Sequence, residues 1–346
     1  MASIPGQRRA PSGLRWKTGP RCEEMNPANR ILRTDGLLLL TALIWGFAFV
    51  AQRRGMQDIG PFAYNGVRFA LGTLSLLPLL ILGKRRARTS PEGMHAGLGP
   101  LAKTGWAALA GLILFLGASL QQVGLVYTTA SNAGFITSLY VILVPLIGVC
   151  LGRPSGLRIW MGAVLAVVGL FILSVGTGFT MAPGDLFQLV GAFFWAGHIL
   201  LINRLVSRMA ALEIAVGQFA TCSLLSLGVA LIWEPASFAG VGPAAVPILY
   251  GGLLSIGVAY TLQIVAQKTA HPAHASIILS MEALFAAIGG VLFLREPLTL
   301  RLALGGLLML TGMIISQLEP SAVPSGEDHD GLASSIIEHA VDGSEE

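Results

Sequence analysis

The stretch SIILSMEALFAAIGGVLFL, residues 276–294, decides the fold class. Its 19 residues are about the length that crosses a bilayer as a helix, and its single charged residue, Glu282, lies near the middle. An ionised carboxylate at the centre of a membrane helix costs roughly 2.5–3.5 kcal/mol on insertion scales. Glu282 is therefore the first candidate functional residue, because its carboxyl group needs a neutral state, hydration or a partner.

The composition is that of a polytopic, all-α membrane protein. The 346 residues are 54% hydrophobic and 12% charged, against about 25% charged in a soluble domain, and the mean hydropathy is +0.72. Cys22, Cys150 and Cys222 form no CxxC pair, so we expect neither a disulfide framework nor a metal site. The net charge of +4 is spread over the termini and loops, which argues against a nucleic-acid partner.

Ten apolar runs predict ten transmembrane helices, at about 36–52, 61–83, 105–124, 130–151, 157–175, 184–203, 211–233, 244–266, 273–294 and 298–317. Basic residues indicate their orientation. With the N-terminus in the cytoplasm, 17 of the 22 Lys and Arg residues lie on the cytoplasmic side, four lie outside and Arg68 lies within a helix. We therefore expect a multi-pass protein of the cell (inner) membrane with both termini cytoplasmic.

The chain also contains an internal repeat. The segment 35–49 resembles 184–198, and their tryptophans, Trp45 and Trp195, stand 150 positions apart, each about ten residues into its helix. The segment 130–154 likewise aligns with 273–297. Apolar helices align to some degree in any case, but the paired tryptophans and the matching prolines at the ends favour a repeat. Each half holds five helices, and because five is odd the second half enters the membrane from the opposite side. Inverted repeats are typical of secondary transporters, which bind substrate near the midplane between the halves.

Four segments follow from this reading. Residues 1–35 form a basic cytoplasmic tail without the apolar core of a signal peptide. Met25 is an alternative first residue of the protein. Residues 36–175 form the first five-helix repeat and residues 184–317 the second. Residues 318–346 form an acidic tail that we expect to be disordered.

Five motifs occur in an order that characterises one group of transporters. They are LIWGFAFV (43–50), VRFALG (67–72), YTTASNAGFITSLY (127–140), FFWAGHIL (193–200) and SMEALFAAIGGVLFLREPLT (280–299). Between residues 36 and 317 the chain resembles the EamA-type members of the drug/metabolite transporter superfamily. The resemblance implies gradient-driven movement of small metabolites without ATP hydrolysis, and the chain has no GxxxxGK[ST] loop.

Two features depart from the pattern that the resemblance implies. A Glu is expected in the turn of both repeats, but Arg153-Pro154 stands in the first and Glu296-Pro297 in the second. A Glu-Pro pair is expected in the ninth helix, where this chain has Glu282-Ala283. We therefore expect no kink in that helix.

A helical wheel places Glu282 on a face of small residues. Ala286 and Gly289 lie within about 40° of it, whereas Ile277 and Leu284 lie on the other side and should face lipid. The carboxyl group should thus point into the bundle or a water-filled cavity. Two readings stay open: a site for a proton or a cationic substrate, or a protonated or paired structural residue that holds the helix in the bundle.

Arg68 is the other charge within a predicted helix. It lies seven residues after Pro61, about 10 Å below the outer surface at the rise of a helix. Its long side chain could extend toward Glu282 or outward to the interface. We interpret Arg68 as a structural intramembrane charge that anchors its helix or binds backbone carbonyls.

Aromatic side chains occur near mid-depth in both halves. Trp45 and Trp195 lie about 14–16 Å from the starts of their helices, whereas tryptophan usually prefers the interface. They either line a cavity and contact substrate or pack in the core. His198 follows Trp195 by three residues and is either a proton relay or a hydrogen-bonded core histidine.

Neutral polar side chains supply further candidates. Tyr140, Tyr260 and Gln263 lie deep in their helices and either hydrogen-bond a substrate or hold helices together. The same two readings apply nearer the outer ends, to Gln121, Gln122 and Asn132. His271 and His274 have i, i+3 spacing without a nearby acidic or cysteine partner, so we expect no metal site there.

These features predict a secondary active transporter and not an enzyme. It would move a small metabolite or drug-like solute by alternating access, coupled to protons or another gradient, without a cofactor. Its partners would be the solute, the bilayer and a coupling ion, and a homodimer is compatible with the sequence. We expect the substrate or proton site at Glu282, Trp45, Trp195, His198, Tyr140, Tyr260 and Gln263. A passive channel or facilitator is the alternative; an intramembrane enzyme is disfavoured because no HExxH motif, helix-buried aspartate pair or Ser-His set occurs.

Overall fold

The structure is a computed structural model that describes residues 27–89, 99–128, 130–152, 155–174, 183–294 and 300–318. Within these ranges every regular element is a helix. Outside the described residues lie 1–26 with Met25, the turn residues Arg153-Pro154 and Glu296-Pro297, and residues 319–346. Residues 27–35, which were expected in the N-terminal tail, form the first part of α1.

The elements follow one another in this order: α1 (Pro27–Gly55), α2 (Pro61–Thr89), α3 (Pro100–Tyr127), α4 (Ala130–Thr137), α5 (Tyr140–Cys150), α6 (Leu157–Ser174), α7 (Pro183–Leu205), α8 (Ala211–Trp233), the 3₁₀ helix η1 (Pro235–Val241), α9 (Ala245–Leu249), the π-helix η2 (Tyr250–Tyr260), α10 (Thr261–Ala266), α11 (Pro272–Leu279), α12 (Glu282–Leu294) and α13 (Leu300–Gln317).

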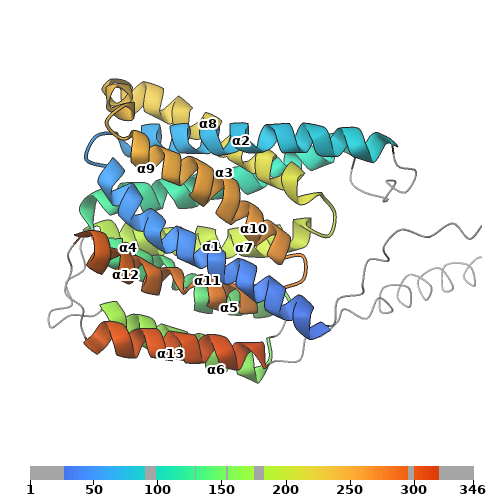
Figure 1. Cartoon of the computed structure of the whole chain (residues 1–346), viewed down its shortest axis with the longest axis vertical. Helices are drawn as coiled ribbons and strands as arrows, with labels where there is room; N and C mark the ends of the chain where they lie inside the picture. Colours follow the sequence, from blue (N-terminus) through green and yellow to red (C-terminus); the bar gives the residue numbers. More distant parts are fainter. Residues whose placement is uncertain are drawn as a thin grey trace, which may run out of the picture.

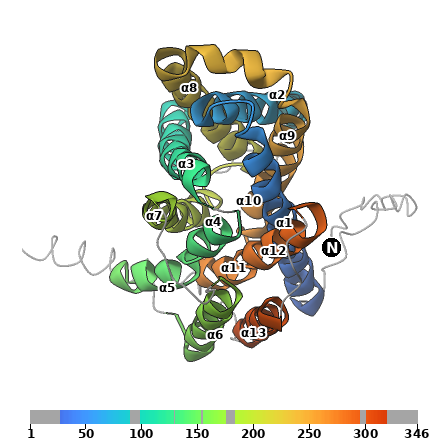
Figure 2. The same ribbon diagram turned by 90° about the vertical axis from the view of Figure 1, so that its left-hand side faces the viewer.

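The helices form an elongated bundle whose members run side by side (Figure 1). The pair α2 and α8 packs at one side of the bundle, and the pair α6 and α13 packs at the opposite side. Between them lie α1, α3, α7, the composite α9–η2–α10 and the two divided helices α4/α5 and α11/α12. Figure 2 shows α1, α3, α4, α7 and α10 around the centre of the molecule.

Glycines bring α6 and α13 together backbone to backbone. A Cβ atom added to Gly162 would lie 2.6 Å from the carbonyl oxygen of Gly312, and one added to Gly312 would lie 2.6 Å from that of Gly162. Two helical turns further along α6, a Cβ atom added to Gly169 would lie 2.6 Å from the carbonyl oxygen of Gly305. Small residues at such crossings are typical of helices that associate within a membrane.

In the part of the chain that the structure describes, eight helical segments are long and apolar enough to cross a membrane. The helices α6 and α13 contribute the shorter apolar stretches Leu157–Ile172 and Ala303–Ser316. Their outward faces carry exposed apolar side chains such as Phe171 and Leu307. A surface of this kind is suited to contact with lipid tails rather than with water.

Two of the helices expected from the sequence are each divided in two. The run 130–151 forms α4 and α5 with an interruption at Ser138 and Leu139, and the run 273–294 forms α11 and α12 with an interruption at Ser280 and Met281. At both places the chain uses tighter i to i−3 hydrogen bonds, since Val141 N–H donates to Ser138 O and Ala283 N–H donates to Ser280 O.

The expectation of an unkinked ninth helix is therefore wrong. The two interruptions lie against each other, and the Ser138 hydroxyl donates to the Ser280 carbonyl at 3.4 Å. The contact between the helices, and not a proline, accompanies the break. Ile277, which the helical wheel placed toward lipid, is 1% exposed because α11 is covered by α5, α6 and α13.

The run 244–266 is not a regular helix either, because its middle forms the π-helix η2. Side chains of α1 bind carbonyl groups of this segment. Trp45 Nε1 donates to Ser255 O at 3.2 Å, and the Thr41 hydroxyl donates to Ala259 O at 3.3 Å. Runs of π-helix are uncommon and occur often at functional sites.

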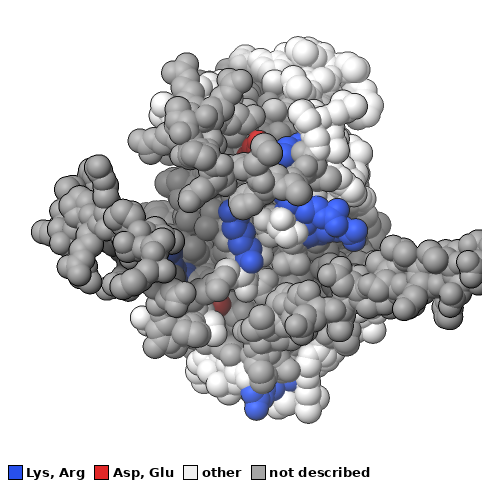
Figure 3. Space-filling model, turned by 90° about the vertical axis from the view of Figure 1, so that its right-hand side faces the viewer, with Lys and Arg blue, Asp and Glu red and all other residues white. Residues whose placement is uncertain are grey.

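Basic side chains gather at the end of the bundle where α1 begins and α10 ends, which Figure 3 shows face on. Exposed residues at the helix ends there include Arg33, Arg204, Arg208 and Lys268. This end of the bundle therefore has a basic surface.

Candidate functional site

A cavity lies in the middle of the bundle, where both halves of the chain contribute to its wall. Its empty volume is about 530 Å³, a figure that includes the open space at its mouth. The residues that line it are Trp45, Phe49, Gln52, Arg68, Gln121, Thr137, Tyr140, Trp195, His198, Ile199, Ser255, Ile256, Tyr260, Gln263 and Glu282.

The cavity brings together all seven residues that the sequence marked as a substrate or proton site, from five different membrane segments. They are Glu282, Trp45, Trp195, His198, Tyr140, Tyr260 and Gln263. Arg68 and Gln121 also line it, whereas Gln122 is fully buried elsewhere and the Asn132 side chain is not among the described parts.

Glu282 is the first residue of α12 and lies directly after the interruption of the ninth membrane segment. It is 4% exposed, and its Oε1 accepts a hydrogen bond of 3.0 Å from the hydroxyl of Tyr140. The start of α12 can come this close to α1 because α1 has Gly46 there: a Cβ atom at Gly46 would lie 2.7 Å from the Glu282 carbonyl oxygen. The N-terminal end of a helix also favours a negative charge.

An aromatic wall forms one side of the cavity, with Tyr260 at its centre. The Tyr260 ring lies 4.5 Å from that of Trp45 and 6.4 Å from that of Trp195, measured between centroids. The indole N–H of Trp45 is bonded to Ser255 O. Among the described residues the buried indole nitrogen of Trp195 and the Oε1 of Gln263 have no hydrogen-bond partner. A buried polar atom without a partner costs about 1–3 kcal/mol, so both atoms are suited to bind a guest molecule or water.

His198 has a side-chain partner on α8. Its Nε2 lies 2.8 Å from Oε1 of Gln218, and its ring stands edge-on to Tyr260 with centroids 6.1 Å apart. The histidine is 1% exposed and lines the cavity at the same time. The geometry accommodates both readings of the sequence, because a bonded histidine can also face a ligand.

Arg68 is part of the cavity wall and is 3% exposed. Its Nε donates to Asn65 Oδ1 at 3.0 Å, and its guanidinium carbon lies 5.2 Å from the ring centroids of both Tyr64 and Phe69. The residue thus stays at the cavity instead of extending outward to the interface. Stacking on aromatic rings stabilises the charge there.

The sequence analysis missed several residues of the wall, among them Phe49, Gln52 and Thr137. Gln52 follows Trp45 by seven residues, so it lies on the same face of α1 two turns on, and this spacing could have identified it. Gln52 and Gln121 bind each other, with Nε2 of Gln121 donating to Oε1 of Gln52 at 3.1 Å.

Within the described part of the chain no group of three or more His, Cys, Asp or Glu residues is arranged to hold a metal ion. His274 instead binds Asp35 and Ser316 through its two ring nitrogens. The site therefore has one carboxyl group, one guanidinium group and several neutral polar groups within an aromatic enclosure.

Comparison with known proteins adds a second line of observation. The model of the EamA-like transporter family matches the chain twice, at residues 32–175 and 182–317. The chain belongs to the EamA-like transporter family. The two matches correspond closely to the two halves expected from the sequence.

Several relatives of this EamA-like protein have names that describe them as transporters. A protein of Archaeoglobus fulgidus called "Uncharacterized transporter" is 32% identical over 83% of this chain and 86% of its own length. The "Uncharacterized inner membrane transporter YedA" of Escherichia coli K12 is 28% identical over 66% of this chain and 69% of its own. A crystal structure with 17% identity superposes with a TM-score of 0.66 over 82% of this chain and 96% of that one, which shows a shared fold. The EamA-like chain is thus a multi-pass membrane transporter by family.

Proposed function

We propose that this EamA-like protein is a secondary active transporter that moves a small solute through the central cavity by alternating access. The observation that carries the proposal is the position of Glu282: a buried carboxyl group at the interruption of a membrane helix, facing a cavity lined by both halves. Divided helices that place a polar site at the midplane are typical of secondary transporters with inverted repeats.

Several features support two inverted repeats of five membrane segments. The family model matches each half separately. The short helices α4 and α11 are both eight residues long and begin 142 positions apart, and each is followed by an interruption. The packing also repeats: α1 packs on η2 and α10 as α7 packs on α3, and α1 packs on α11 and α12 as α7 packs on α4 and α5. The pairs α2·α8 and α6·α13 then consist of equivalent helices.

The orientation follows from the same scheme. Ten segments, with α6 and α13 as the fifth and tenth, leave both termini on one side of the cell membrane. The basic side chains of Figure 3 lie at that end, which supports its assignment to the cytoplasmic side.

Glu282 serves in this proposal as the site for a proton or a cationic group of the solute. The carboxyl group can be stabilised in both states, because burial disfavours its charge while the N-terminus of α12 and the Tyr140 hydroxyl favour it. A solute or proton bound at Glu282 would be exposed to one side of the membrane at a time. The free Trp195 N–H and Gln263 carbonyl would hold neutral parts of the solute.

The proposal is tested with purified protein in two steps. A thermal-shift screen against cationic, zwitterionic, anionic and neutral metabolites identifies a binder, since any ligand of the folded state raises the unfolding temperature. Uptake of that compound by proteoliposomes is then followed with and without a pH gradient. Accumulation above the external concentration that an uncoupler abolishes is the expected result. Uptake that stops at equal concentrations would instead favour the channel or facilitator, and chemical conversion of the compound would favour an enzyme.

A further inference from the structure

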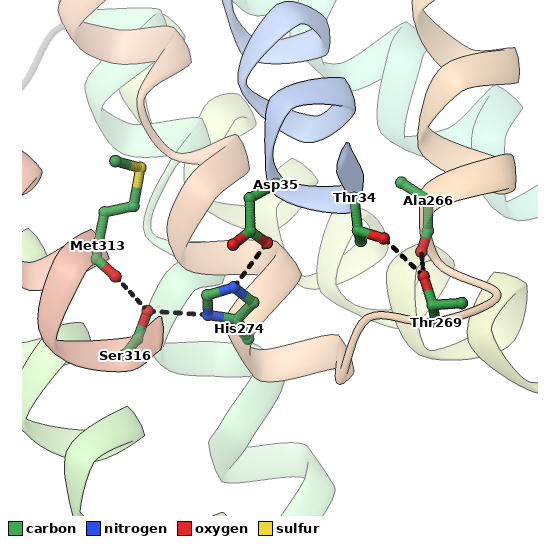
Figure 4. Close-up of polar contacts among 7 residues, drawn as sticks. All are labelled: Thr34, Asp35, Ala266, Thr269, His274, Met313 and Ser316. Carbon is green, nitrogen blue, oxygen red and sulfur yellow. Dashed lines mark hydrogen bonds and ion pairs between the residues drawn. The ribbon is translucent and has the colours of Figure 1, made fainter. Parts of the chain in front are cut away.

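A hydrogen-bonded cluster joins α1, α11 and α13 at the end of the bundle where α1 begins (Figure 4). Asp35 Oδ1 lies 2.9 Å from His274 Nε2, and His274 Nδ1 lies 2.9 Å from the hydroxyl of Ser316. Asp35 belongs to α1, whereas His274 and Ser316 belong to α11 and α13, so the cluster joins the two halves of the chain. When Asp35 is ionised its carboxylate can only accept, so the Nε2–H of His274 is then the donor.

A second bond between the halves lies beside this cluster. The hydroxyls of Thr34 and Thr269 are 2.8 Å apart, and Thr269 follows α10 in the connection to α11 (Figure 4). The start of α1 is therefore tied both to that connection and to α11.

A second set of hydrogen bonds between the halves lies at the opposite end of the bundle. The Thr128 hydroxyl, at the end of α3, donates to Asp185 Oδ1 at 2.5 Å, and Asp185 lies in the first turn of α7. Beside it the Thr137 hydroxyl donates to Gln188 Oε1 at 3.1 Å, and Gln188 Nε2 donates to Gln121 O at 2.8 Å. These bonds also join the first half of the chain to the second.

The two carboxylates occupy equivalent positions in the repeat. Asp35 precedes Trp45 by ten residues, and Asp185 precedes Trp195 by ten residues. Each is nearly buried, at 7% and 3% exposure, and each binds a residue of the other half. Because the halves are antiparallel in the proposed arrangement, the two aspartates lie at opposite ends of the cavity.

We propose that Asp35 and Asp185 are the positioning residues of the two gates of the transport path, Asp35 for the cytoplasmic gate and Asp185 for the outer gate. This assignment rests on the alternating-access function proposed above. Opening one end requires the bonds between the halves at that end to break, while those at the other end persist. A substitution that weakens the hydrogen bonds of one aspartate therefore favours the state in which the cavity is open on the side of that aspartate.

The test uses a single cysteine in the cavity as a reporter. Ser255→Cys is introduced into a chain whose Cys22, Cys150 and Cys222 are replaced by alanine. A membrane-impermeant maleimide is applied to right-side-out and to inside-out vesicles. Asp35→Asn and Asp185→Asn keep the size of the side chain and remove its charge, and Asp58→Asn, at an exposed loop aspartate, is the matched control.

Asp35→Asn is expected to raise labelling from the cytoplasmic side and to lower it from the outside, and Asp185→Asn is expected to do the reverse. The change should be about threefold to tenfold, the range of one net hydrogen bond, because asparagine keeps an acceptor oxygen but loses the charge that strengthens the bond between the halves. Thr128→Val and His274→Gln provide a second pair of variants, because they change the partner instead of the aspartate. Thr128→Val should shift labelling as Asp185→Asn does, and Asp58→Asn should shift nothing.

Equal changes from both sides, or none, in both aspartate variants would overturn the gate assignment, since a purely structural role has no preferred side. That outcome leaves the transport function standing if the reporter of the unmodified chain is labelled from both sides. A reporter that is never labelled from one of the two sides, in any variant, would contradict alternating access itself and the gates with it.

Discussion

The two divided helices, α4/α5 and α11/α12, have the same shape but different chemistry at their interruptions. The residue that opens α5 is Tyr140 and the one that opens α12 is Glu282, 142 positions later. At the wall of the cavity the Tyr140 hydroxyl donates a hydrogen bond of 3.0 Å to Oε1 of Glu282. One half thus contributes a neutral donor and the other the ionisable group. In the proposed repeat, the shared backbone thus supplies the position, and the side chain that differs, Glu282, supplies the proposed function.

The largest expected effect comes from making the two interruptions chemically alike. Tyr140→Glu would place a second carboxyl group within hydrogen-bond distance of Glu282 in a nearly buried site. Leaving a buried charge without a partner costs about 3–5 kcal/mol, so the variant should unfold at a clearly lower temperature. Thermal unfolding in detergent measures this. The exchanged variant Tyr140→Glu/Glu282→Tyr should recover much of the loss, and no recovery would show that the two positions are not equivalent.

A substitution on α1 tests the contact that holds the interruption in α11/α12. A Cβ atom at Gly46 would lie 2.4 Å from the Cβ of Phe285, so Gly46→Val should push α12 away and lower stability by about 1–3 kcal/mol. Gly36→Ala, also on α1, is the control, because no atom lies within 4 Å of the added carbon. Equal unfolding temperatures of the two variants would contradict the close packing of α1 on α12.

Removing the hydroxyl of Tyr140 tests the contact between the two interruptions while the aromatic ring stays in place. Tyr140→Phe deletes the hydrogen bond to Glu282, which is worth about 1–3 kcal/mol in the ionised state. Transport should persist, with its optimum moved to a different pH, and uptake measured from pH 5.5 to 8 would detect the move. Tyr250→Phe removes a tyrosine bond of similar length, to Ile44 O at 2.9 Å, outside the cavity and should leave the profile unchanged. Identical pH profiles for the two variants and the unmodified protein would show that the Tyr140 hydroxyl does not affect transport.

The smallest effect on activity is expected from cysteines placed at the two ends of the bundle. Cysteine at Asp58, after α1, should react with an impermeant maleimide from outside intact cells. Cysteine at Ser207, between α7 and α8, should react only when the membrane is opened or inverted. Outside labelling at residue 207 would reverse the proposed topology and with it the assignment of the gates.

Much of the cavity wall could be predicted from the sequence, because a polar or aromatic side chain at mid-depth in an apolar helix is rarely placed against lipid tails. That argument identified Glu282, the two tryptophans and Gln263, and all of them line the cavity. The proposed repeat rests on the same kind of residue, since Trp45 and Trp195 stand 150 positions apart in the two halves.

The interruptions and the π-helix could not be predicted in this way. Neither Ser138-Leu139 nor Ser280-Met281 contains proline or glycine, the usual local signals of a break. Contacts between distant segments accompany these irregularities: Ser138 binds Ser280 O, and Trp45 binds Ser255 O in η2. The extension of α2 to Thr89 was missed for another reason, because basic residues continue a helix beyond the apolar run that marks a membrane segment.

The central claim is that the charge of Glu282 couples solute movement to a gradient. The most direct measurement is uptake by proteoliposomes that contain the Glu282→Gln variant, compared with the unmodified protein across pH 5.5–8. Glutamine keeps the size of the side chain and one oxygen that can accept the Tyr140 hydrogen bond, but it cannot gain or lose a proton. The account predicts a folded variant that no longer accumulates solute in response to a pH gradient. Accumulation equal to that of the unmodified protein over the whole range would contradict it and leave Glu282 a structural residue.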